Sequence, residues 1–240
     1  MLRLLMIADD FTGALDTGVQ LAAHGIPTQV VVGQADLSAC SSTVLVVDTE
    51  TRHLSAAKAA EAVARLTRSA VENGVGCIYK KTDSALRGNI GAELAALLKA
   101  SGARNLPFLP AFPQIGRTTK KGVHYIDGVP VNESPFGIDP FEPVRCAEVT
   151  KLIHLQTDMP AQNLRPARRQ RTRPAFWCMT PPPPQIWKPP DGSCSRMEHP
   201  RCWQAAQALP PFCRSCWGFR TAAWWKSRSW TPGCWCSAAA

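Results

Sequence analysis

Residues 2–25 read LRLLMIADDFTGALDTGVQLAAHG, and this stretch decides the fold. It opens with a nearly continuous apolar run, which is typical of a parallel strand buried on both faces. Two aspartates end the run, and Thr12 and Gly13 follow them as candidate helix caps. The remainder has helical spacing, with one apolar face formed by Leu15, Val19 and Ala22. A strand that passes directly into a helix is the first unit of an α/β sheet.

The rest of residues 1–160 repeats this alternation. Further strands are predicted at residues 29–33, 43–52, 76–84 and 104–112, and further helices at residues 55–74, 89–102 and 144–157. Right-handed crossovers between such strands give an open, mainly parallel α/β sheet with flanking helices. Asp127-Gly128 lies between two alternating runs, which predicts a hairpin with a two-residue turn.

The composition changes sharply near Met159. Residues 1–160 contain 15 Lys and Arg against 16 Asp and Glu, whereas residues 161–240 contain 12 against two. The second part also holds seven of the ten Cys and all eight Trp. We therefore predict a domain over residues 1–160 and a non-homologous tail over residues 161–240, in which no periodic apolar pattern indicates a helix or strand.

Three interpretations of the tail are open. Translation of a wrong frame of a GC-rich gene accounts for its composition best, because shifted codons for Leu, Ala, Gly and Val give Trp, Arg, Pro and Cys. Such a tail would replace a second domain and would have no selected fold. Cysteine pairs such as Cys213 with Cys216 suggest zinc, although the CxxC and CxC spacings form no recognised pair of knuckles. Arginines between residues 165 and 173, together with the tryptophans, suggest a nucleic-acid surface.

The N-terminus carries no visible export signal. Its apolar run is too short for a membrane span and lacks a small-residue cleavage site, which predicts a cytoplasmic protein without a membrane partner. In a reducing compartment Cys40, Cys77 and Cys146 are expected to be free thiols. The sequence leaves open whether the chain forms a homodimer.

Polar clusters follow three of the predicted strands, at Asp9-Asp10, residues 48–52 and residues 80–87. In open α/β sheets ligands bind beyond the carboxyl ends of the strands, so we expect these clusters to meet. Successive side chains of a strand point to opposite sides. One of Asp9 and Asp10 should therefore face the crevice while the other caps the following helix.

The segment KKTDSALRGN, residues 80–89, is the most specific of these clusters. Its cations and the free N–H groups of the next helix would hold a carboxylate or phosphate, and its Asp, Ser and Asn would bind hydroxyls. This favours a small polyhydroxy acid as ligand, and the alternative is a solvated loop with internal ion pairs. Arg52 is either a second cation that binds the ligand carboxylate or a member of a surface ion pair. A flexible loop is expected to carry Arg117, Lys120 and Lys121. This loop is either a lid or a segment whose charges are simply solvated.

Nucleotide-binding fingerprints are not visible in residues 1–160. No GxxxxGK[ST] segment occurs, and no GxGxxG follows the first strand. The missing glycine fingerprint disfavours a dehydrogenase built on this sheet.

Four segments together carry a family resemblance. They are IADDFTGALDTGVQLA (7–22), TETR (49–52), YKKTDSALRGNIGAEL (79–94) and PAFPQIGRTTKKGVHYIDGVPVNESPFGIDP (110–140). In this order they resemble the N-terminal domain of the four-carbon acid sugar kinases, over about residues 2–160. The TDSxLRGNIGAE form is more similar to the D-threonate kinase branch than to the 3-oxo-tetronate branch.

The resemblance implies ATP- and Mg²⁺-dependent phosphorylation of the terminal 4-hydroxyl of a four-carbon sugar acid. In that family the N-terminal domain holds the acid and a C-terminal domain binds ATP, and the glycine-rich ATP-binding segments have no counterpart after Pro160. We therefore expect this chain to be the substrate-binding half, with little or no kinase activity. The alternative is a non-catalytic sugar-acid-binding module whose basic tail binds nucleic acid.

The resemblance also assigns residues. The substrate-binding motifs contain Asp9, Arg52, Lys81, Thr82, Asp83 and Ser84, and beside them lie Asp10 and Arg87. It assigns Arg52 and Lys81 to the substrate carboxylate. It assigns Asp83 and Ser84 to the hydroxyls, and Asp9 to the catalytic role of orienting or deprotonating the attacking hydroxyl. No metal ligand is assigned, and phosphoryl transfer depends mainly on positioning and on shielding of charge by Mg²⁺.

Overall fold

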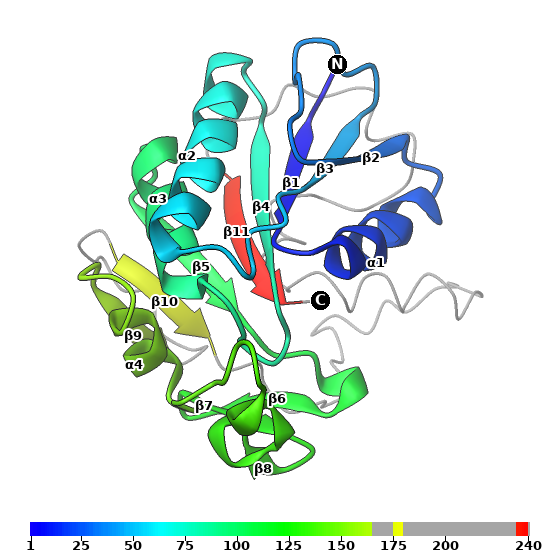
Figure 1. Ribbon diagram of the computed structural model, residues 1–240. Helices are drawn as coiled ribbons and strands as arrows, with labels where there is room; N and C mark the ends of the chain where they lie inside the picture. Colours follow the sequence, from blue (N-terminus) through cyan, green and yellow to red (C-terminus); the bar gives the residue numbers. More distant parts are fainter. Residues whose placement is uncertain (165–174, 180–233, 240) are drawn as a thin grey trace, which may run out of the picture.

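The computed structural model describes residues 1–164, 175–179 and 234–239 (Figure 1). Its main feature is a parallel sheet in the order β2-β3-β1-β4-β11-β5-β10-β9. The strands are β1 (Leu4–Ala8), β2 (Thr28–Val32), β3 (Val44–Asp48), β4 (Cys77–Thr82), β5 (Asn105–Leu109), β9 (Ala161–Leu164), β10 (Ala175–Met179) and β11 (Cys234–Ala239). The predicted fold class is confirmed.

Helices cover both faces of this sheet (Figure 1). Helix α1 (Phe11–Ala22) lies on one face, and α2 (Ala56–Glu72) and α3 (Ile90–Ser101) lie together on the other. The short helix α4 (Val149–His154) packs against α3 and β9. Every residue of β1, β3 and β4 is buried, because these central strands are covered on both faces.

Helix α1 packs through small residues and not through the apolar face suggested by its sequence. Its buried positions are Gly13, Ala14, Thr17, Gly18 and Leu21. By contrast Leu15 and Val19 are 42% and 56% exposed. A Cβ atom on Gly18 would lie 3.3 Å from Val30, so glycine permits the helix to approach the sheet closely. With this face against the sheet, Leu15 and Val19 lie on the outer side of the helix.

Three short strands lie where the sequence pattern indicated none. Strand β11 is inserted between β4 and β5, and β10 pairs with β5 and β9. Exposed backbone edges of β4 and β5 need partners, and a parallel strand of any composition can supply the hydrogen bonds. The expectation of a tail without strands is wrong at these positions. The interpretations based on Cys213, Cys216 and the arginines between 165 and 173 fall outside the described residues.

A small antiparallel sheet lies below the carboxyl ends of the large sheet in Figure 1. Its strands are β6 (Arg117–Lys120), β7 (Val123–Ile126) and β8 (Val129–Pro130), and the 3-10 turns near it are η1 (Pro113–Ile115), η2 (Val131–Glu133) and η3 (Pro135–Ile138). The predicted hairpin is confirmed, with φ of 49° at Asp127 and 87° at Gly128. The expectation of a flexible loop for Arg117 is wrong, because β6 is paired with β7 along its length.

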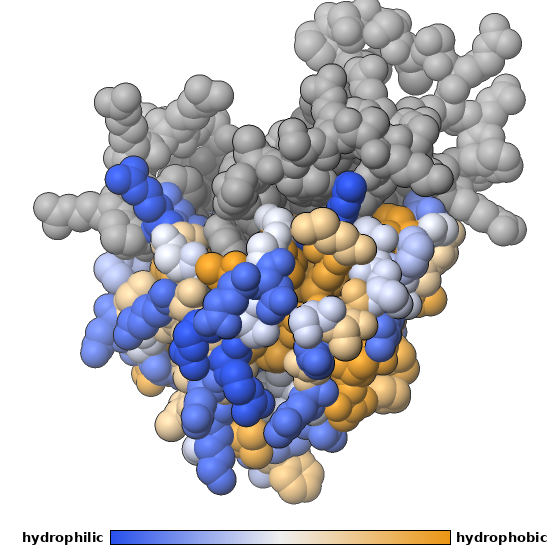
Figure 2. All heavy atoms as spheres, turned by 90° about the horizontal axis from the view of Figure 1, so that it is seen from above, coloured by the Kyte–Doolittle hydropathy of each residue, from blue (hydrophilic) through white to orange (hydrophobic). Residues whose placement is uncertain are grey.

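The face at the amino ends of the strands is seen in Figure 2. Hydrophilic side chains gather in its middle, and an apolar area lies beside them. Within the described ranges, no helix has the length and apolar character needed to cross a membrane. Cys40, Cys77 and Cys146 are free thiols, as predicted.

Candidate functional site

The three polar clusters meet because their strands are neighbours. Strands β3, β1 and β4 lie side by side in register, with Ala8 paired to both Asp48 and Lys81. The residues that follow these strands therefore emerge at one edge of the sheet. All eight residues expected to bind substrate lie at or just beyond this edge. They are Asp9, Asp10, Arg52, Lys81, Thr82, Asp83, Ser84 and Arg87.

Arg52 joins the aspartates of this edge. Its Nε donates to Asp9 Oδ2 and its Nη1 to Asp10 Oδ2, both at 2.8 Å, and its Nη2 lies 3.9 Å from Asp83 Oδ1. The residue is only 8% exposed. Burial alone would lower the pKa of Arg52, but the three carboxylates raise it above its ordinary value. Arg52 is thus a buried cation that holds the three aspartates together, and its interpretation as a member of a surface ion pair is wrong.

Asp9 and Asp10 have the separate roles that strand geometry predicts. Asp10 is the N-cap of α1, and its Oδ1 accepts a hydrogen bond from the Gly13 amide at 3.0 Å. The cap is therefore Asp10, one of the two alternatives that strand geometry offered, and not Thr12 or Gly13. Asp9 is buried, and its Oδ1 accepts no hydrogen bond from the described residues. A buried carboxylate oxygen without a donor is costly, so this atom is available to a ligand hydroxyl.

Lys81 lies opposite these carboxylates. Its Nζ donates to the Thr82 carbonyl oxygen at 2.7 Å, which is its one hydrogen bond to a described residue. An ammonium has three N–H donors, so two remain. Burial lowers the pKa of Lys81, although Asp9 and Asp10 oppose this effect. A Cβ on Gly13 would lie 2.6 Å from Asp10 Oδ1 and 2.9 Å from Lys81 Nζ, so glycine keeps this space open.

The start of the segment after β4 is held by a local ion pair. Arg87 Nε donates to Asp83 Oδ2 at 2.7 Å and its Nη2 to Asp83 Oδ1 at 3.1 Å. Burial alone would raise the pKa of Asp83, but Arg87 and Arg52 lower it. Thr82 is buried, and its Oγ1 has no partner among the described groups. Ser84 is half-buried, and no described group hydrogen-bonds its hydroxyl.

Sequence reasoning missed a buried ion pair behind the site. Lys80 Nζ lies 2.9 Å from Glu93 Oε2, and both side chains are almost fully buried. The Thr51 hydroxyl donates to Glu93 Oε1, and the Asn89 amide donates to the carbonyl oxygens of Thr51 and Leu54. These contacts fix the loop that carries Arg52. A lysine and a glutamate on otherwise apolar faces of a strand and a helix were the available signal.

Asp48 at the end of β3 was also not assigned. It is fully buried, its Oδ1 accepts from the Glu50 amide at 2.9 Å, and its Oδ2 has no described partner. Burial raises the pKa of Asp48, and the charges of Glu50, Asp10 and Asp9 add to this. The Asp48 carboxyl is therefore easier to protonate than that of an ordinary aspartate.

His124 of β7 ties the small sheet to the site. Its Nε2 lies 2.8 Å from the Ser84 carbonyl oxygen and its Nδ1 lies 2.9 Å from Thr119 Oγ1. The ring is fully buried. Nε2 therefore donates to the carbonyl, and neutral Nδ1 accepts from the hydroxyl. Burial lowers the pKa of His124, which agrees with a neutral ring.

His124 should make stability depend on pH. Between about pH 7.5 and about pH 5.5, we expect wild type to lose about 1 kcal/mol more stability than His124→Gln. The folded ring stays neutral because its pKa is lowered, while the unfolded ring binds a proton below about pH 6.5. The stabilisation is therefore complete above that pH and is lost as the pH falls. Urea unfolding at both pH values measures it, and equal losses in the two proteins would contradict the prediction.

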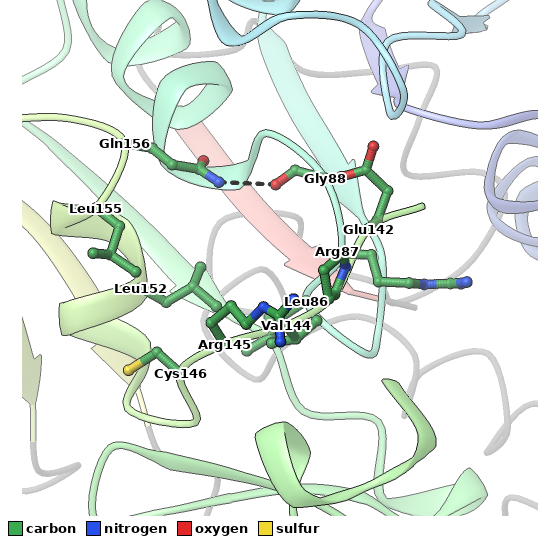
Figure 3. Close-up of a pocket in the computed structure, with 11 residues that line it drawn as sticks. Leu86, Arg87, Gly88, Glu142, Val144, Arg145, Cys146, Leu152, Leu155 and Gln156 are labelled. Atoms are coloured by element: carbon green, nitrogen blue, oxygen red, sulfur yellow. Dashed lines mark hydrogen bonds between the residues drawn. The ribbon is translucent and has the colours of Figure 1, made fainter. Parts of the chain in front are cut away.

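A pocket of about 150 Å³ lies beside this site (Figure 3). It is lined by Leu86, Arg87, Gly88, Glu142, Pro143, Val144, Arg145, Cys146, Leu152, Leu155 and Gln156. The guanidinium of Arg87 points away from it, and Gln156 Nε2 donates to the Gly88 carbonyl oxygen at 2.9 Å. Arg87 is the one expected substrate-binding residue among its described lining. We therefore place the candidate site at the carboxylates and not in this pocket.

The family model described as the sugar-binding N-terminal domain matches residues 4–175. The chain belongs to this family. The match includes β1, β3 and β4 with all the polar residues that follow them. The resemblance inferred from the four sequence segments is confirmed at the level of the family.

Curated relatives of this sugar-binding domain are named as kinases. A D-threonate kinase of Salmonella typhimurium is 39% identical over 160 residues, which are 66% of this chain and 38% of that kinase. A D-erythronate kinase of Heliobacterium modesticaldum is 33% identical over 161 residues, or 65% of this chain and 37% of the relative. The chain thus spans about two fifths of the length of these relatives.

Solved structures share the fold of this sugar-binding domain. A domain from Bordetella bronchiseptica, described as a domain-swapped dimer with bound citrate, has a TM-score of 0.65 and 33% identity. The match covers 74% of this chain and 47% of that one. A Haemophilus influenzae protein has a TM-score of 0.66 at 24% identity over 74% of this chain and 48% of that one, which shows the fold alone.

Proposed function

We propose that this domain binds a four-carbon acid sugar, D-threonate or a related tetronate, as the substrate half of an ATP-dependent kinase. The observation that carries the proposal is the buried juxtaposition of Asp9 and Lys81 at the strand ends. Asp9 Oδ1 lacks a donor and Lys81 Nζ has unused donors among the described residues. The names of the relatives support the choice of ligand.

Asp9 is the proposed catalytic residue. Its free oxygen can accept the proton of the 4-hydroxyl, which increases the nucleophilicity of the oxygen that attacks the phosphoryl group. Arg52 holds Asp9 in position. Lys81 is proposed to bind the acid through its unused N–H donors. Asp83 and Ser84 are proposed to bind its remaining hydroxyls, and Thr82 offers an unpaired buried hydroxyl beside them.

Mg²⁺ and ATP would supply the phosphoryl group and shield its charge. In the described part of the chain, no group of three or more His, Cys, Asp or Glu could hold a metal ion. We propose that these cofactors bind to the portion of the relatives that this chain does not match. Accordingly, we propose that the 240-residue chain binds the acid without transferring phosphate.

Thermal unfolding with D-threonate tests the proposal. An acid present at about one hundred times its Kd should stabilise the chain by about 2.7 kcal/mol. Asp9→Asn should lose this stabilisation, whereas Asp16→Asn, an exposed change on α1, should retain it. ADP release is assayed in parallel. No stabilisation by D-threonate or D-erythronate would refute acid binding, and ADP formation that depends on the acid would refute the inactivity of the chain.

The partners and the origin of residues 161–240 are further proposals. The Bordetella relative is described as a domain-swapped dimer, which supports a homodimer for this chain. Light scattering after gel filtration would measure its mass. A cytoplasmic location stays a prediction.

The frameshift interpretation is tested by resequencing the codons for Met159 to Leu164 and translating each downstream frame. A continuation rich in Gly, Ala, Leu and Val in another frame would support it.

A further inference from the structure

Arg117 differs from the other two cations of its segment. Lys120 and Lys121 are exposed, as solvated charges are. The Arg117 side chain, at the start of β6, is only 17% exposed. A guanidinium that is mostly removed from water needs hydrogen-bond acceptors, so its partners decide what it does.

The described residues leave most donors of Arg117 unused. A guanidinium carries five N–H donors. Its Nε is buried and has no described acceptor, and its Nη1 lies 3.5 Å from Asp127 Oδ2. Asp127 is 74% exposed, and a long contact to a solvated carboxylate contributes little. Arg117 is therefore a partly buried cation short of acceptors.

The ring of Phe136 contacts both Arg117 and a second guanidinium, that of Arg87. The Cζ atoms of Arg117 and Arg87 each lie 5.2 Å from the centroid of this ring. Arg87 already donates to Asp83, and its Nη1 lies 3.5 Å from Asp139 Oδ2. Cation–π contacts fix both guanidiniums against one ring without using their N–H groups. Among the described carboxylates, Arg87 thus has close partners, whereas Arg117 has only the long contact to the exposed Asp127.

The small sheet places Arg117 next to the acid-binding edge. Arg117 and Thr119 are two residues apart on β6, so their side chains lie on the same face. Thr119 contacts His124, and His124 contacts the Ser84 carbonyl oxygen. The charge of Arg117 also contributes to the lowered pKa of His124, after the larger effect of burial. Arg117 therefore faces the segment from Asp83 to Arg87.

We propose that Arg117, with Phe136 and Arg87, forms an oxyanion-binding subsite for the acid-sugar ligand. The oxyanion is either the carboxylate of the acid or the phosphoryl group of the phosphorylated product, since a guanidinium fork binds both in the same way. The inference rests on the proposed function for the identity of the ligand. The carboxylate belongs to the acid sugar and the phosphoryl group to its phosphorylated form, so no other ligand has to supply the oxyanion.

Titration calorimetry on the full chain tests the subsite with three probes: D-threonate, D-threonate 4-phosphate and inorganic phosphate. Arg117→Gln should weaken the binding of at least one of the two acids roughly ten- to hundredfold. Weaker binding of both acids assigns the carboxylate to the subsite, and weaker binding of the 4-phosphate alone assigns the phosphoryl group. Lys120→Gln removes the same charge from the same strand and should change each Kd by less than about twofold, because exposed charges are screened. Arg117→Lys should fall between wild type and Arg117→Gln, since it keeps the charge and loses the fork.

Other outcomes separate this inference from the proposed function. Unchanged affinity of Arg117→Gln for both acids would overturn the subsite. If wild type binds neither acid, the proposed function fails, and the phosphate titration then decides about Arg117 alone. Phosphate binding that is lost in Arg117→Gln and kept in Lys120→Gln supports the subsite, and any other phosphate result overturns it. Circular dichroism and the Tm of each variant establish that it is folded.

Discussion

Arg52→Gln is expected to lower the free energy of unfolding by about 3–5 kcal/mol, because it leaves buried carboxylates without their cation. Arg52 donates to Asp9 and Asp10 at 2.8 Å and lies near Asp83. Without it these like charges face each other in a site of low exposure. Urea unfolding at neutral pH measures the loss, and calorimetry should show that D-threonate binding is also lost.

Two comparisons make this result specific. Arg68→Gln, on the exposed face of α2, removes the same charge and should change stability by less than about 0.5 kcal/mol. Asp9→Asn removes one of the repelling carboxylates, so Arg52→Gln should cost less in that background than in wild type. A loss for Arg52→Gln as small as that for Arg68→Gln would show that Arg52 does not organise the site.

The order of elements was readable from the sequence because each local signal agreed with the global fold. The apolar run of β1 ends in a carboxylate that caps α1, and the Asp127-Gly128 turn requires the positive φ that the structure shows. The convergence of the polar clusters followed from parallel topology alone. No contact had to be known in advance to place Asp9, Arg52 and Asp83 at one edge.

The errors in the fold have a common physical cause, which is that tertiary packing overrode the local pattern. In α1, Gly18 lies against Val30 of the sheet, so this close approach and not the apolar spacing decides which face is buried. The cations after Gly116 indicated a loop, yet β7 supplies that segment with a strand partner. Strand β11 fills a position between β4 and β5 that only the complete sheet defines.

Within the site, sequence reasoning found polar groups that meet at one edge of the sheet and missed the groups that hold them in place. Arg52 was interpreted as a carboxylate clamp, yet its nitrogen atoms face Asp9, Asp10 and Asp83. The Lys80–Glu93 pair joins residues 13 positions apart, on a strand and on the helix that follows it. Such pairings depend on the packing of whole elements, and single-residue patterns do not encode them.

The Lys80–Glu93 pair should show strong coupling in a double-mutant cycle. Lys80→Met and Glu93→Leu are each expected to cost about 3–5 kcal/mol, because each removes the opposite charge from a buried ion pair. The double variant should be more stable than either single variant, since an apolar pair carries no desolvation cost. Lys99→Met, at an exposed position at the end of α3, is the control and should change stability by less than about 0.5 kcal/mol. Additive losses in the double variant would contradict coupling between the two groups.

Ligand binding in the double variant distinguishes a stabilising role of the pair from a positioning role. Glu93 accepts the hydroxyl of Thr51, which precedes Arg52, so a leucine at position 93 removes the anchor of that loop. We expect the double variant to regain stability and still bind D-threonate about tenfold more weakly than wild type, because Arg52 and Asp9 lose their fixed geometry. Wild-type affinity in a stable double variant would show that the pair contributes to folding alone. Weakened affinity would show that a buried charge pair is retained because it positions the acid-binding residues.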